Sequence, residues 1–390
     1  MPTRITRRIP AIATTACAAA AFGLGTAYAE QDQDLRYAIG FPDGSMLHDA
    51  ALEFSDMVGE FSDDTLSVNV YPLTLLNFEE MSGGIQSGIA DLGGILTGYF
   101  PSEYPSYNMI GESTMFLNLL DVDDVKGRMA FLGAMNEFTF NHCPECHEEF
   151  QAQNQVFTGG TVGGIYELMC DEPVQSMDDL DGTRLRAGGP QWARWTEEVG
   201  ASSVSLSANE AFEALNHGVV DCVIIAAPEL VNLGIIDAVS DITSGIPGGT
   251  FAASVAASAN ADTWKGLSEN QREAVLQSSA YMGANLIERY VDQEEEVMGE
   301  RIPEEGITVH EPDDELVDAT ETFTIDDLEK IAANYADRHD VERAEEMLET
   351  FEDLLHTWVE RVEDVDSAEE LGELYWEHVF SEVDVTEHGM

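Results

Sequence analysis

Short apolar runs of strand length alternate with amphipathic runs of helix length through the first third of the chain. The strand-like runs cover residues 35–39, 66–71 and 90–96, and helix-like runs at 46–61 and 79–88 lie between them. A strand followed by a helix and another strand is typical of a parallel sheet with helices on its faces. The pattern therefore predicts an α/β fold with a parallel sheet here.

The same alternation returns in the middle of the chain. Strand-like runs cover residues 154–157, 164–169, 184–186 and 219–225, with helix-like runs at 190–199 and 208–217. About 360 residues follow the N-terminal leader, which is enough for two such units with a cleft between them. We expect lobe I to comprise residues 30–155 with 250–310, and lobe II to comprise residues 156–249.

Beyond residue 261 the pattern becomes helical. Helix-like runs cover residues 264–298, 326–362 and 368–379, and a short strand candidate lies at 308–309. Within the second run, apolar side chains recur at helical spacing, which predicts a packing stripe. Its members are Met347, Phe351, Leu354, Leu355, Trp358 and Val362. We expect residues 311–390 to form C-terminal helices that pack on the two lobes.

Composition adds an unusual surface to this fold. The chain has 75 acidic and 17 basic residues, a formal net charge of −58 at pH 7, yet 44% of its residues are hydrophobic and can build a core. Self-repulsion of this size is screened at about 1 M salt, where the Debye length is roughly 3 Å. Because the acids are dispersed, we interpret them as a halophilic surface; an acidic face for a basic partner would cluster them. The lack of a basic stripe argues against nucleic acid as a partner.

The first 29 residues have the features of an export signal. Arg4, Arg7 and Arg8 precede a short apolar run at 11–25, and a small-residue site at 27–29 precedes Glu30. The run is too short to span a bilayer, and no later stretch is long and apolar enough to do so. We therefore expect cleavage after Ala29 and a periplasmic protein. The sequence leaves the general and twin-arginine export routes open.

Residues 176–228 contain a candidate anion site. Ser207 and Glu210 have the spacing of a helix capping box, and a Gly188-Gly189 turn leads from the strand at 184–186 into a helix that starts near Pro190. A helix N-terminus presents free backbone N–H groups, and a guanidinium at the strand end suits a carboxylate. Arg186 holds that position, although Arg184 and Arg186 pairing with surface acids is the alternative.

The order of short motifs around this segment resembles the substrate-binding proteins of tripartite ATP-independent periplasmic (TRAP) transporters. The motifs are FPDGS at 41–45, GIADLG at 88–93, EYP at 103–105, DLDG at 179–182, RLR at 184–186, VGA at 199–201, EAFEAL at 210–215 and GVVD at 218–221. Each motif is weak alone, but the ordered set spans nearly the whole chain after the leader.

The resemblance implies a two-lobed α/β periplasmic binding protein with a helical C-terminal segment. Such a receptor closes on an organic acid and delivers it to the membrane permease subunits of a TRAP transporter; it is not an enzyme and has no cofactor. It also implies that Arg186 pairs with the substrate carboxylate, which leaves Arg184 a structural or surface role. No Gly-x-Ser-x-Gly, His-Glu-x-x-His or phosphate-loop motif supports an enzymatic alternative.

Departures from the family pattern bear on the ligand. Tyr166 lies where sialic-acid-type members have a further arginine, and Ile225 lies near the position of their asparagine. Members that bind a metal-bridged oxoacid have a glutamate near Ile224, which this chain lacks. We therefore expect a more apolar pocket, a monocarboxylate or hydrophobic carboxylic acid as ligand, and no obligatory metal. The predicted binding residues are Arg186, Tyr166, Trp192, Gly188, Gly189, Phe100 and Ile225.

The cysteines allow several interpretations. Cys143, Cys146 and His147 fit the Cys-x-x-Cys-His pattern of c-type haem attachment, and the same residues are compatible with zinc or with a redox thiol at a helix start. An exported haem or thiol redox protein is thus the alternative function. Four cysteines remain after the leader, at 143, 146, 170 and 222, and an even number in an oxidising compartment favours structural disulfides. The sequence does not choose among their three pairings.

Overall fold

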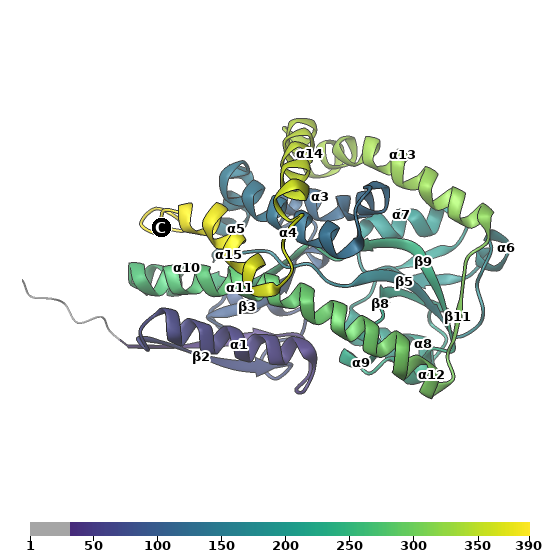
Figure 1. Ribbon diagram of the computed structural model, residues 1–390, viewed down its shortest axis with the longest axis horizontal. Coiled ribbons are helices and arrows are strands. Elements are labelled where there is room, and N and C mark those ends of the chain that lie inside the picture. Colours follow the sequence, from purple (N-terminus) through teal and green to yellow (C-terminus); the bar gives the residue numbers. More distant parts are fainter. Residues whose placement is uncertain (1–31) are drawn as a thin grey trace, which may run out of the picture. The chain divides into compact units, whose positions relative to one another are not determined.

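The structure is a computed structural model that describes residues 32–390. The predicted export signal at 1–29 lies outside the described residues. Two mixed sheets form the frame of two lobes, and helices cover them (Figure 1). The α/β two-lobed fold with C-terminal helices is confirmed.

The first sheet has the strand order β2-β1-β3-β10-β4. Its strands are β1 (Gln33–Ile39), β2 (Leu66–Pro72), β3 (Leu92–Leu96), β4 (Gln155–Val156) and β10 (Ser254–Asn260). The N-terminal β1, β2 and β3 are parallel, as predicted, but β10 runs antiparallel to β3 and β4. The predicted parallel arrangement of the three N-terminal strands is confirmed, and the complete sheet is mixed because a strand that returns from the second sheet runs against its neighbours.

The second sheet has the order β11-β9-β5-β8-β6-β7. Its strands are β5 (Ile165–Cys170), β6 (Arg184–Arg186), β7 (Ser202–Val204), β8 (Cys222–Ala226), β9 (Asp241–Thr250) and β11 (Thr308–His310). Here β5 is antiparallel to both β8 and β9, so this sheet is mixed as well. Because β11 pairs with β9, the expected lobe I range of 250–310 ends in a strand of the second sheet.

Three segments connect the two sheets. Residues 157–164 lead from β4 to β5, residues 251–253 lead from β9 back to β10, and the long helix α11 (Glu269–Glu296) leads toward β11. In Figure 1, α11 starts beside α10, passes α1 and ends near α12. Residues from all three connections meet at the site described below.

The helices of the two lobes cap and cover the sheets. They are α1 (Met46–Phe61), α2 (Met81–Gln86), η1 (Thr97–Tyr99), α3 (Pro105–Gly111), η2 (Glu112–Leu119), α4 (Asp124–Asn141), α5 (Pro144–Ala152), α6 (Met177–Leu180), α7 (Pro190–Glu198), η3 (Ala208–Glu210), α8 (Ala211–Asn216), α9 (Glu229–Asn232) and η4 (Ile236–Ala238). The Ser207 capping box forms as predicted, on η3, and Gly218 follows α8 with a φ of 62°, in the left-handed region that glycine favours.

The C-terminal part is helical, with breaks that the pattern did not predict. Its elements are α10 (Ala261–Gly266), α11, the π-helix η5 (Val297–Arg301), α12 (Ile302–Glu305), α13 (Asp314–His339), α14 (Ala344–Arg361), α15 (Ala368–His378) and η6 (Phe380–Glu382). Ser268 caps a new helix after α10, and Asp340 adopts a left-handed φ of 57° after α13. The stretches predicted as helical over 264–298 and 326–362 are thus helical, each interrupted by one short break.

The predicted packing stripe lies on α14. Met347, Phe351, Leu355 and Trp358 are buried, and the helix packs on α4 of lobe I. The Trp358 ring fits against Gly133 of α4, where an added Cβ would lie 2.3 Å from the ring. The C-terminal helices thus extend the core of the first lobe. Within residues 32–390, no helix is long and apolar enough to cross a membrane.

Both cysteine pairs form disulfides. Cys143 bonds Cys146 at the start of α5, and Cys170 bonds Cys222 between the paired strands β5 and β8. Both sulfurs of the Cys-x-x-Cys motif are thus used, so neither is available for a haem thioether or a zinc bond. Within the described residues, no group of three or more His, Cys, Asp or Glu side chains is arranged to hold a metal.

Candidate ligand-binding site

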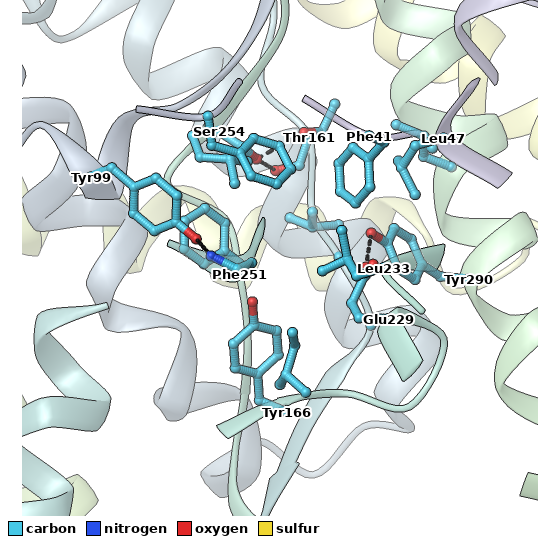
Figure 2. Close-up of a pocket in the computed structure, with 18 residues that line it drawn as sticks. Phe41, Leu47, Tyr99, Thr161, Tyr166, Glu229, Leu233, Phe251, Ser254 and Tyr290 are labelled. Atoms are coloured by element: carbon cyan, nitrogen blue, oxygen red, sulfur yellow. Dashed lines mark hydrogen bonds between the residues drawn. The ribbon is translucent and has the colours of Figure 1, made fainter. Parts of the chain in front are cut away.

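A cavity of about 80 Å³ lies where the two sheets and their connections meet (Figure 2). Its wall is mostly apolar, with a few hydroxyl groups and one carboxylate. The lining residues are Phe41, Leu47, Phe78, Leu96, Tyr99, Thr161, Val162, Gly163, Gly164, Tyr166, Ala208, Ile225, Glu229, Leu233, Phe251, Ser254, Leu286 and Tyr290. A small apolar cavity with few polar groups suits a small ligand held at specific points.

Arg186 ends strand β6 beside this cavity and is only 1% exposed. Its guanidinium donates to the backbone oxygen of Leu206 at 3.1 Å, to that of Ile224 at 3.4 Å and to the hydroxyl of Tyr99 at 2.8 Å. All three acceptors are neutral, and within residues 32–390 no carboxylate forms an ion pair with this side chain. A buried cation without a counter-charge is costly unless an anion joins it.

Two tyrosine hydroxyls lie next to this charge. The Tyr99 hydroxyl accepts from Arg186 and, at 3.0 Å, from the backbone N–H of Ala208, which leaves its own proton free to be donated. In Figure 2 the Tyr166 hydroxyl points toward the middle of the cavity. Burial raises the Tyr166 pKa well above its usual value, so this hydroxyl stays neutral and can donate. A guanidinium with two neutral O–H donors is a suitable environment for a carboxylate.

The Tyr166 ring is held by aromatic stacking. Trp192 stacks on it at a centroid distance of 4.1 Å, and Phe251 lies 6.2 Å from Trp192 in a nearly parallel plane. The Trp192 indole N–H donates to the Gly248 backbone oxygen at 3.0 Å, which fixes the ring. Trp192 is fully buried and does not line the cavity, so it supports the wall from behind Tyr166.

The other predicted residues divide between two cavities. Ile225 lines the cavity beside Tyr166, whereas Gly188, Gly189 and Phe100 line a neighbouring space of about 570 Å³ in front of α7. Tyr99 borders both. Gly188 touches the arginine: a Cβ there would lie 2.9 Å from an Arg186 terminal nitrogen, so a larger residue would displace the guanidinium. The arginine and the glycine turn are thus neighbours, but the helix N-terminus opens on the second cavity.

Arg184 has a different environment from Arg186. Its side chain is 44% exposed and forms a two-point ion pair with Asp221, the shorter contact being 2.6 Å. Arg272 is a third case, a buried arginine that donates to three backbone oxygens, two of them at the end of α10. Those oxygens have the partial negative charge of a helix C-terminus, and Arg272 borders neither cavity. Arg186 does not line either cavity itself, but of these three it alone bonds a lining residue, through the hydroxyl of Tyr99.

A buried carboxylate forms part of the same wall. Glu229 begins α9, directly after β8, and is 6% exposed. Its Oε1 accepts from the Tyr290 hydroxyl at 2.7 Å (Figure 2). Burial raises the Glu229 pKa to about 7, against smaller opposing effects from Tyr290, Asn232 and the charge of Arg186.

Four residues that line the cavity were not predicted from the sequence as binding residues: Tyr99, Glu229, Phe251 and Tyr290. Phe100 was predicted rather than the adjacent Tyr99, because the sequence does not show which of two neighbouring residues faces the cavity. Glu229 had a usable signal, since a carboxylate directly after the fully buried strand β8 is unusual unless it has a role. Phe251 and Tyr290 lie in connections whose position depends on the packing of both lobes.

Comparisons with known proteins agree with this architecture. Residues 37–334 match the bacterial extracellular solute-binding proteins, family 7, also called DctP. A similar solved structure is DctP7 of Bordetella pertussis, an extracytoplasmic solute receptor binding pyroglutamic acid. It is 18% identical, with a TM-score of 0.66 over 82% of this chain and 99% of that chain.

Two further structures have the same fold. One is a TRAP solute-binding protein from an unidentified marine microbe, specific for aromatic acids and crystallised with 3-hydroxybenzoate; it is 15% identical, with a TM-score of 0.69 over 84% of this chain and 99% of that chain. The other is a TRAP periplasmic solute-binding protein from Desulfovibrio desulfuricans with bound sn-glycerol-3-phosphate, 18% identical, with a TM-score of 0.69 over 83% and 97%. Because the family match covers most of the chain, the protein belongs to the bacterial extracellular solute-binding proteins of family 7, which are non-enzymatic receptors.

Proposed function

We propose that this protein is a periplasmic receptor that binds a small organic acid and delivers it to the membrane permease of a TRAP transporter. The observation that carries the proposal is the buried guanidinium of Arg186, which has only neutral partners within the described chain and lies beside an apolar cavity. A ligand carboxylate would supply the missing negative charge, with Tyr99 and Tyr166 donating to it.

The surroundings of Arg186 favour a ligand with one carboxylate. Arg186 supplies one cation behind the wall, through its bond to Tyr99, and the wall itself is largely Phe, Leu, Val and Ile side chains. A second carboxylate would be buried without a partner, which costs several kcal/mol (on the order of 2–5). Pyroglutamic acid and 3-hydroxybenzoate, named for two of the similar structures, each have a single carboxylate on a small ring. The proposal includes no obligatory metal.

The partner and the compartment are also part of the proposal. The family description as extracellular, together with the predicted export signal, supports a periplasmic receptor. The TRAP proteins among the similar structures support delivery to a TRAP permease. The dispersed acids support a halophilic habitat, in which case the midpoint of thermal unfolding falls as salt is withdrawn.

A thermal-shift screen of small carboxylic acids in high salt tests the proposal. Each acid is paired with its neutral carboxamide, which keeps the shape and removes the charge. At a hundredfold excess over Kd, a ligand stabilises the folded state by about 2.7 kcal/mol, which is readily measured as a higher midpoint. We expect saturable shifts for a subset of monocarboxylates and none for their carboxamides. Equal shifts for acids and carboxamides, or no shift for any acid, would contradict the proposal.

A further inference from the structure

Glu229 leaves one carboxylate oxygen unused at the wall of the cavity. Its Oε1 accepts from Tyr290, but its Oε2 is buried and has no hydrogen-bond partner within residues 32–390. The nearby Asn232 donates one amide N–H to Gln293 at 2.9 Å. A buried acceptor without a partner lowers stability, so its presence at a cavity wall points to a ligand.

Glu229 and the carboxylate-binding group lie apart. Tyr99, which contacts Arg186, and the Glu229–Tyr290 pair are at opposite sides of the view in Figure 2, and the Tyr166 hydroxyl points into the space between. Burial raises the Tyr290 pKa well above its usual value, and Glu229 raises it further, so Tyr290 stays neutral and donates to Oε1. The cavity wall also has apolar residues, among them Ile225, Leu233 and Phe251.

We propose that Glu229 is a second ligand-anchoring residue, whose Oε2 accepts a hydrogen bond from an N–H or O–H group of the bound acid. This inference rests on the proposed function, because it takes the ligand carboxylate to be held by Arg186. The ligand class is a small monocarboxylic acid with a hydrogen-bond donor at some distance from its carboxylate. Arg186 and Glu229 together bind the two ends of such a molecule, and the apolar wall contacts its middle.

A purely structural role is the alternative. The hydrogen bond between Glu229 and Tyr290 ties α9 to α11, and a residue that only did this would affect all ligands equally. The two roles therefore differ in ligand preference rather than in stability. A series of acids of matched size separates them.

The probes are pentanoate, 4-hydroxybutyrate and 4-aminobutyrate, which have the same number of heavy atoms and differ only at the end distant from the carboxylate. A rigid pair, 3-methylbenzoate and 3-hydroxybenzoate, repeats the test on a ring. We expect the wild type to bind the best donor-bearing acid about 10- to 100-fold more tightly than its donor-free counterpart, as a hydrogen bond to a charged group predicts. The hydroxyl and ammonium members show whether the site prefers a neutral or a charged donor.

In the Glu229→Met variant the preference disappears, because the acceptor is replaced by an apolar side chain of similar length. Glu229→Gln is the second variant should Glu229→Met not fold, and it reduces the preference at least several-fold. Glu167→Gln is the matched control: Glu167 is a largely buried carboxylate on β5 that accepts from Ser244 and does not line the cavity. It leaves the preference unchanged.

An unchanged preference in the Glu229 variants, or an equal loss of affinity for donor-bearing and donor-free acids, would overturn the inference while leaving the proposed function intact. A wild type that binds these acids without any donor preference would also overturn the inference. If no acid of either series binds the wild type, the inference is overturned, and the wider screen with carboxamide controls decides the proposed function separately.

Discussion

Two arginines buried to the same degree have opposite surroundings. Arg128 on α4 is 2% exposed and forms a two-point ion pair with Glu294 of α11, with contacts of 3.2 and 3.0 Å. Arg186 on β6 is 1% exposed and donates only to neutral oxygens. The first charge is neutralised by the protein itself, and the second is left for another molecule.

The difference shows how to separate a structural from a binding arginine. Glu294 also accepts from the backbone N–H of Ile165 at 3.0 Å, so the Arg128 pair fixes the point where the chain enters the second sheet. Arg186 instead bonds Tyr99, which lines a cavity and keeps a proton to donate. Burial alone does not identify a binding residue; burial without a counter-charge, beside a cavity, does.

The largest expected effect comes from breaking the structural pair. Glu294→Gln leaves Arg128 buried without a counter-charge, which lowers the free energy of unfolding by about 3–5 kcal/mol. Denaturant titration in high salt, with fitted slopes compared between variants, measures it. A loss below about 1 kcal/mol would mean that the buried charge of Arg128 does not need Glu294 for stability. The contrast between Arg128 and Arg186 would then fail.

The converse change at Arg186 has a smaller effect on the ligand-free protein. Arg186→Met removes an uncompensated charge, which is favourable, and three hydrogen bonds to neutral groups, each worth about 1 kcal/mol. We expect the unfolding free energy to change by less than about 2 kcal/mol in either direction. The same titration measures it, and a loss as large as that of Glu294→Gln would assign Arg186 a structural role.

Glu229 predicts a dependence of stability on pH. Burial raises its folded-state pKa to about 7, above the usual value of an unfolded glutamate, so the protonated form is favoured by folding. Its contribution is fully present below about pH 4.5 and is lost as pH rises through about 7. Without ligand, Glu229→Gln is therefore more stable relative to the wild type at pH 8 than at pH 5. Thermal unfolding at both values checks the sign, and an equal difference at the two values would contradict it.

The smallest effect is expected at the exposed pair. Arg184→Gln breaks the contact with Asp221, but both groups reach solvent, so the loss of stability is small and shrinks in high salt. Chemical denaturation at two salt concentrations measures it. A loss comparable to that of Glu294→Gln would remove the distinction between the exposed Arg184 and the buried Arg128.

The sequence predicted elements whose pattern is local. Helix 46–61 and strand 66–71 match α1 and β2, because an amphipathic face and an alternating strand are properties of neighbouring residues. Strands β9 and β10 were missed: β9 contains three glycines and a proline, and β10 is mostly Ala and Ser and is buried along its whole length, so neither has a clear alternating pattern. Helix α4 was missed because it is buried on most sides and shows no amphipathic period.

At the site, the sequence identified the charge but not its surroundings. Arg186, Tyr166 and Ile225 lie together, because strands β5, β6 and β8 are neighbours in one sheet. Tyr99 and Tyr290 come from lobe I and α11, and only tertiary packing brings them to the cavity. Whether an apolar residue faces a ligand or supports the wall, as Trp192 does behind Tyr166, was likewise not a local property.

The most direct test of the central claim is calorimetric titration of the best-binding acid from the screen into the wild type, Arg186→Lys and Arg184→Lys. Lysine keeps the charge but lacks the planar fork, and truncation of a buried, hydrogen-bonded charge pair costs about 2–5 kcal/mol. We expect no measurable binding by Arg186→Lys and wild-type affinity for Arg184→Lys. Wild-type affinity in Arg186→Lys would contradict the assignment of Arg186 as the carboxylate-binding residue.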